Sequence, residues 1–191
     1  MSQIEVLEYV RDFADRSHGT QVRKYTGERY IGHPLRVMET VRKYRDEVPV
    51  LAAALMHDVL EDTPVTQEEI GNALIAALNP TEAAKALMLV VELTDVFVKE
   101  NYPRLNRRSR KEKVEVRLSG VSSDAQTIKY ADIIDNVTDI VKQDVDFAKV
   151  YVREAKKMLL LMEAGHPGLR ARAMQIVDEY LQGIKNAATL R

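Results

Sequence analysis

Hydrophobic residues recur every three to four positions along nearly the whole chain, and no segment alternates apolar and polar residues as a half-buried strand would. Ile4, Leu7, Val10 and Ala14 set this spacing at the start of the chain. Such a period places apolar side chains on one face of a helix. Hydrophobic residues make up 46% of the 191 residues, enough for a sizeable core. The sequence therefore predicts an all-α fold, a helical bundle of about nine helices.

Helix boundaries are marked by capping residues and prolines. Ser2 with Glu5, and Thr66 with Glu69, have the spacing of a capping box. One long apolar helix is expected over Val48–Glu61. The absence of a long linker or repeat predicts a single domain over residues 1–191, with a motif-bearing core at about 1–145 and C-terminal helices at about 146–184.

Charge and composition exclude several classes of protein. With 28 basic and 29 acidic residues, the chain lacks the positive charge of a protein that coats nucleic acid. It has no apolar run long enough for a membrane span, no signal-peptide pattern and no cysteine. We therefore expect a cytoplasmic protein without disulfides or cysteine-ligated zinc.

The segment ALMHDVLED, residues 54–62, places His57, Asp58, Glu61 and Asp62 at the end of an apolar helix. Burying charge without a partner is costly, so these side chains need a compensating group. Spacings of four residues predict that they share one broad helix face. Adjacent histidine and aspartate side chains can bind one divalent cation.

Further ligands are available elsewhere in the chain. His33 stands at the start of a predicted helix, and Asp132 lies among apolar residues. Each residue taken alone has a structural interpretation: His57 could be a hydrogen-bonded core residue, and Asp132 a buried carboxylate paired with Lys129 or an arginine. Their combination on a cysteine-free helical chain favours a metal site.

Three segments carry a resemblance to a known family: ADRSHGTQVRKYTGERYIGHP (Ala14–Pro34), AALMHDVLEDT (Ala53–Thr63) and TIKYADIIDN (Thr127–Asn136). They resemble the HD-domain metal-dependent phosphohydrolases, and in particular the hydrolase domains of RelA/SpoT-type alarmone enzymes and their small stand-alone relatives. That branch removes the 3′-pyrophosphate of guanosine tetra- or pentaphosphate, (p)ppGpp, by attack of a metal-bound water. The resemblance implies the same activity on a small nucleotide substrate.

The resemblance also implies roles for individual residues. The metal would be manganese, although a mixed nitrogen and oxygen ligand set also suits iron or zinc. Glu61 and Asp62 match the catalytic acidic pair. The expected metal ligands are His33, His57, Asp58 and Asp132, and the substrate-binding residues that the resemblance implies are Arg23, Lys24 and Asn136. Apart from the resemblance, we also expect Lys129 to bind substrate.

The chain departs from the alarmone pattern near the expected pocket. Asp95 stands where that branch has a lysine, and Ile133 and Thr138 stand where it has arginines. The basic segment between residues 102 and 117 could replace these cations, with Arg104 and Arg107 binding phosphate. The alternative is a solvated helix face, which is the usual role of a charge run.

Two other functions remain open. The altered residues around Asp132 favour an HD phosphohydrolase acting on a different nucleotide. The third possible function is that of a helical regulatory or binding protein that catalyses no reaction. The presence of all four expected metal ligands argues against it. The apolar stripes beyond residue 146 would form core or the seam of a homodimer.

Overall fold

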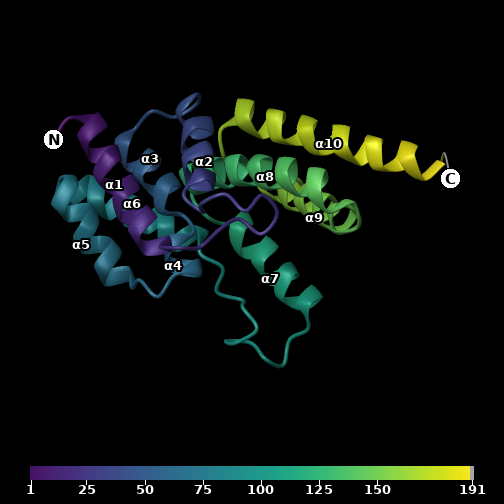
Figure 1. The fold of residues 1–191 in the computed structure, drawn as a ribbon, viewed down its shortest axis with the longest axis horizontal. Coiled ribbons are helices and arrows are strands. Elements are labelled where there is room, and N and C mark those ends of the chain that lie inside the picture. Colours follow the sequence, from purple (N-terminus) through teal and green to yellow (C-terminus); the bar gives the residue numbers. More distant parts are fainter. Residues whose placement is uncertain (190–191) are drawn as a thin grey trace.

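The computed structural model describes residues 1–189, and their side chains as far as residue 184. This part of the chain is all-α, as predicted, and it contains no helix that is both long and apolar enough to cross a membrane. Its ten helices (Figure 1) are α1 Gln3–His18, α2 Gly32–Arg42, α3 Val48–Met56, α4 Val59–Asp62, α5 Gln67–Ala77, α6 Pro80–Leu93, α7 Arg107–Ser119, α8 Ser123–Gln143, α9 Val145–Leu161 and α10 Pro167–Thr189.

The prediction of one helix over Val48–Glu61 is wrong, because the helix is interrupted at His57 and Asp58. Helix α3 ends at Met56, and α4 begins at Val59. Successive residues of an uninterrupted helix point about 100° apart, so two neighbouring side chains would diverge. The turn instead lets His57 and Asp58 face the same point, with 3.2 Å between His57 Nε2 and Asp58 Oδ2.

Helix α3 forms the centre of the bundle because it is apolar on every side. Its residues from Pro49 to Met56 are all buried. It packs against α1, α2 and α6, while α8 packs against α2, α9 and α10 (Figure 1). A helix that is hydrophobic all round is stable only inside a core. The residues at its end are therefore held by a rigid part of the protein.

The loop between α1 and α2 folds back on itself and fixes the start of α2. Backbone hydrogen bonds join Arg23 N to the Glu28 carbonyl at 2.9 Å and Tyr30 N to the Gln21 carbonyl at 3.0 Å. Gly27 turns the loop with a φ of 71°, a conformation that favours glycine. This closure places Tyr30 and the first turn of α2 beside the end of α3.

Close packing at Gly165 ties α8 to the segment before α10. A β-carbon at Gly165 would overlap the ring of Tyr130. The Tyr130 hydroxyl donates a hydrogen bond of 2.7 Å to the Met162 carbonyl. These contacts anchor the C-terminal helices to the element that carries Asp132.

Candidate metal centre

Four of the predicted site residues meet where α2, α8 and the end of α3 converge. His33 lies in the first turn of α2, His57 and Asp58 lie in the turn after α3, and Asp132 lies in the middle of α8. His33 Nε2 is 3.4 Å from Asp58 Oδ2 and 3.2 Å from Asp132 Oδ1. His57 Nε2 is 3.2 Å from Asp58 Oδ2 and 3.8 Å from Asp132 Oδ1. Two imidazole nitrogens and two carboxylates thus point at one small space.

The donor atoms of this cluster fit a divalent cation. Ligand atoms of His33, His57 and Asp58 all lie within 4.8 Å of one another. His57 Nδ1 donates to the Ala54 carbonyl at 2.8 Å, so in the neutral ring Nε2 carries the lone pair. That Nε2 is buried and makes no hydrogen bond within the described residues. A buried, unpaired nitrogen facing two carboxylates matches what a metal requires of an imidazole ligand.

The metal-free cluster is a set of strongly coupled charges. Burial alone would lower the pKa of His57, but Asp58 and Asp132 outweigh burial and raise it to about 9. The pKa of His33 is raised for the same reason. Burial would raise the pKa of both aspartates, but it is outweighed. The facing imidazoles hold the pKa of Asp58 well below its usual range, and Lys129 together with the imidazoles does the same for Asp132. Without a metal, protons on the imidazoles balance the buried carboxylates.

Asp135 orients His33 from the side opposite the cluster. His33 Nδ1 donates to Asp135 Oδ2 at 2.6 Å. Arg36 Nε donates to Asp135 Oδ1 at 2.7 Å, and an Arg36 amino group reaches Glu28 at 2.6 Å. Burial would raise the pKa of Asp135, but His33 and Arg36 lower it overall. An ionised carboxylate therefore fixes the ring orientation of His33 and leaves its Nε2 facing the cluster.

Of the predicted catalytic pair, only Asp62 is joined to the cluster. The Tyr30 hydroxyl lies 2.8 Å from Asp58 Oδ2 and 2.7 Å from Asp62 Oδ2, which bridges the two carboxylates. Glu61 instead accepts a hydrogen bond of 2.8 Å from the backbone N–H of Asp95. Partial burial raises the pKa of both Glu61 and Asp62, and repulsion by Asp58 adds to this.

Three predicted substrate-binding residues lie at the cluster, where their side chains bind protein groups. Arg23 donates to Asn136 Oδ1 at 2.8 Å and to Asp139 at 3.1 Å, and its side chain is 11% exposed. Asn136 in turn donates to Asp132 Oδ1. Lys129 contacts the other oxygen of Asp132 at 2.7 Å. Each of these groups supports a cluster residue, directly or through a neighbour.

The remaining predicted substrate-binding residues lie outside the cluster. Lys24 is exposed, and its ammonium lies 6.0 Å from the ring centre of Phe147. Arg107 makes a bidentate ion pair with Glu154 of α9, at 2.6 and 2.9 Å. Arg104 is exposed in the loop before α7.

Tyr30 and Asp135 are the site residues to which sequence reasoning gave no role. The signal for Asp135 was its position three residues after Asp132 on the same helix, which a carboxylate on the site face would share. Tyr30 precedes His33 by three residues, but only the folded loop brings its hydroxyl to Asp62.

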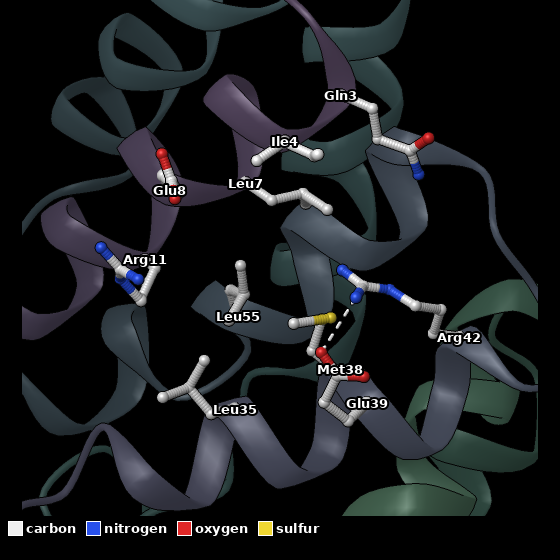
Figure 2. Close-up of a pocket in the computed structure, with 10 residues that line it drawn as sticks. All are labelled: Gln3, Ile4, Leu7, Glu8, Arg11, Leu35, Met38, Glu39, Arg42 and Leu55. Carbon is white, nitrogen blue, oxygen red and sulfur yellow. Dashed lines mark hydrogen bonds and ion pairs between the residues drawn. The ribbon is translucent and has the colours of Figure 1, made fainter.

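A separate hollow lies between α1, α2 and α3, away from the metal cluster. Its volume is about 420 Å³, with an apolar floor and a charged rim (Figure 2). None of the four clustered residues lines it. The lining residues are Gln3, Ile4, Leu7, Glu8, Arg11, Leu35, Met38, Glu39, Arg42 and Leu55.

Comparison with known proteins places this chain among HD domains. The HD domain family matches residues 10–158. A guanosine-3′,5′-bis(diphosphate) 3′-pyrophosphohydrolase of Spiroplasma citri is 27% identical over 176 residues, which cover 92% of this chain. The chain spans only 22% of the length of that relative, and also 22% of a similar relative from Mycoplasma pneumoniae.

Two smaller proteins match over more of their own length. The human guanosine-3′,5′-bis(diphosphate) 3′-pyrophosphohydrolase is 33% identical over 133 residues, which cover 68% of this chain and 66% of the human protein. A solved structure of a metazoan ortholog of SpoT, described as hydrolysing ppGpp, superimposes with a TM-score of 0.74 at 25% identity. That match covers 93% of this chain and 94% of the other.

Proposed function

This chain belongs to the HD-domain family, and from that membership we propose that it is a metal-dependent nucleotide pyrophosphohydrolase that removes the 3′-pyrophosphate of (p)ppGpp. The observation that carries the proposal is the convergence of two imidazole nitrogens and two carboxylates at the end of α3. A third carboxylate, that of Asp62, is linked to this cluster through the Tyr30 hydroxyl. Relatives named for this activity share the fold over most of this chain.

His33, His57, Asp58 and Asp132 would hold the cation. Their mixed nitrogen and oxygen donors suit manganese, with iron or zinc as alternatives. When bound, the cation would supply Lewis-acid polarisation of a phosphoryl oxygen. Asp135 and the Ala54 carbonyl keep the two imidazole rings turned toward it.

Asp62 is the side chain we assign to proton transfer. In this hydrolysis a water oxygen bonds to phosphorus and the bond between phosphorus and the ribose 3′-oxygen breaks. The attacking water loses a proton, and the departing 3′-oxygen takes one up. A carboxylate with a raised pKa is a better base near neutral pH than an ordinary aspartate. Tyr30 orients Asp62 by hydrogen bonding, while Glu61, fixed by the Asp95 N–H, would contact the same water from α4.

Product analysis tests this proposal. The manganese-loaded, metal-stripped and His57→Ala proteins are each incubated with ppGpp, and the products are separated by ion-exchange chromatography. We expect the loaded protein alone to release GDP and pyrophosphate in equal amounts. Intact ppGpp in the presence of tightly bound manganese would refute the substrate assignment and leave the metal site standing.

A different nucleotide is the second candidate, and one observation favours it. Arg23, expected to bind phosphate, is partly neutralised by Asp139 at 3.1 Å and by Asp135 at 4.0 Å. A site with fewer free cations would bind a substrate with fewer phosphates. A panel of nucleoside mono-, di- and triphosphates assayed beside ppGpp distinguishes the two candidates.

We also propose a cytoplasmic, homodimeric protein. A nucleotide substrate supports the compartment. Exposed apolar residues on α9, including Phe147, Val150 and Leu161, support a dimer seam. Light scattering after size-exclusion chromatography measures the number of chains, and a monomer at micromolar concentration would contradict the homodimer.

A further inference from the structure

A second, basic pocket lies between α7 and the loop that precedes it. Its volume is about 260 Å³. Four cationic side chains and one carboxylate line it, together with two apolar residues. The lining residues are Asp95, Phe97, Val98, Lys99, Arg107, Arg110 and Lys111. None of the residues in the metal cluster belongs to this pocket.

Three of the four cations have no anionic partner among the described residues, and two of these three make no hydrogen bond there either. Arg107 is balanced by Glu154, and Arg110 donates to the Leu105 carbonyl at 2.6 Å. Lys99 and Lys111 make no ion pair or hydrogen bond within the part of the chain that is described. Lys111 is half-buried, and a partly desolvated ammonium without a partner is unfavourable unless an anion binds it.

Residues that line the basic pocket are linked to neighbours of the metal centre at two points. Asp95, at its edge, donates its backbone N–H to Glu61 of α4. At the second point, Lys111 also lines a small cavity reached by Lys129, whose ammonium contacts the metal ligand Asp132. A molecule that extends from the metal centre past Glu61 or Lys129 would bring its far end to the basic pocket.

We infer that the basic pocket binds the phosphate group of the nucleotide that is not cleaved, which for ppGpp is the 5′-diphosphate. This rests on the proposed function. A group in this pocket is separate from the metal cluster, so it cannot be the phosphorus under attack. Arg23 is engaged by Asp139, whereas Lys99 and Lys111 line the pocket without a hydrogen-bond or ion-pair partner among the described residues.

The test compares Lys111→Gln with Arg108→Gln in the full chain. Both variants remove one positive charge from α7. Arg108 is a matched control because its side chain is 88% exposed and pairs with Glu112 on its own helix, outside the pocket. Each protein is assayed with ppGpp and with guanosine 5′-monophosphate 3′-diphosphate, which lacks one 5′-phosphate. Circular dichroism checks that both variants fold.

We expect Lys111→Gln to raise KM for ppGpp about ten-fold or more, the usual effect of losing a hydrogen bond to a charged group. It should also remove most of the difference in KM between the two nucleotides, whereas Arg108→Gln should preserve it. Equal effects of Lys111→Gln on both nucleotides, or equal effects of the two variants, would overturn the inference.

A binding measurement separates failure of this inference from failure of the proposed function. Isothermal titration of inorganic pyrophosphate into metal-stripped protein reports on the pocket without turnover. We expect weaker binding by Lys111→Gln and unchanged binding by Arg108→Gln. If the wild-type protein leaves both nucleotides intact, the proposed function fails, and the titration still decides whether the pocket binds a diphosphate. If Lys111→Gln binds pyrophosphate as tightly as the wild-type protein does, the assignment of the basic pocket as a diphosphate site is refuted.

Discussion

Replacing Asp135 by asparagine isolates the contribution of one charge to the metal centre. The substitution keeps the shape of the side chain and one oxygen that can accept from His33 Nδ1, now 2.6 Å away. It removes the negative charge that polarises the imidazole and pairs with Arg36 at 2.7 Å. His33 would then be a weaker and less firmly oriented ligand.

The size of the effect follows from these contacts. A hydrogen bond to a charged group contributes about 1.5–3 kcal/mol, against about 1 kcal/mol for a neutral one. Loss of such a partner behind a metal-bound histidine typically lowers metal affinity by about 10- to 100-fold. We therefore expect Asp135→Asn to bind manganese about 10- to 100-fold more weakly than the wild-type protein. Competition with a fluorescent chelator measures this affinity.

Asp139→Asn is the matched control. Asp139 lies one helical turn further along α8 and contacts Arg23 and Arg36 at 3.1 and 3.6 Å. Among the described residues it makes no hydrogen bond or ion pair with His33. Because both variants replace an aspartate by an asparagine, they change the net charge of the protein equally. Manganese affinity in Asp139→Asn should stay within about three-fold of the wild-type value, a difference of less than 1 kcal/mol. Wild-type affinity in Asp135→Asn, or an equal loss in both variants, would refute the orienting role.

Three further predictions concern the site and the core. Tyr30→Phe should lower kcat about ten-fold or more with little change in manganese affinity, because Asp62 loses its hydroxyl partner; steady-state kinetics would contradict this if kcat were unchanged. Gly165→Ala should reduce the free energy of unfolding by about 1–3 kcal/mol, since its β-carbon overlaps the Tyr130 ring, and urea denaturation measures it; wild-type stability would show that the ring can move. The metal-free protein should lose stability as pH rises from 6.5 to 9, because His57 has a raised pKa of about 9 and contributes fully only below the unfolded value of 6.5. The loss should be on the order of 3 kcal/mol at most, and a metal-free melting temperature that is constant over this range would contradict it.

Much of the fold could be predicted because helix signals are local. The capping boxes at Ser2 and Thr66 start α1 and α5 as the sequence indicated. Helix α8 likewise begins after a serine cap, Ser122, whose side chain accepts from the Ala125 N–H. The break after Met56 was missed because nothing in the apolar run marks it. It is favoured by contacts that form only when α2 and α8 are present.

The site was less accessible to sequence reasoning, because its contacts join distant segments. Spacing indicated that His57 and Asp58 could share a cation, and residue type made His33 and Asp132 candidate ligands. The assignment of all four to one ion was implied by the family resemblance. Asp135 received no role from the sequence, and the fold gives it a partner 102 residues away. Long-range pairs of this kind carry no signal in the periodicity of one sequence.

A stoichiometric manganese titration tests the central claim most directly. Metal-stripped protein is titrated with manganese while pyrophosphate release from ppGpp is followed, beside the His57→Ala variant. The account predicts that the rate rises linearly and saturates at one manganese ion per chain, and that His57→Ala neither binds tightly nor turns over. Pyrophosphate release that is independent of manganese, or equal in His57→Ala, would contradict it.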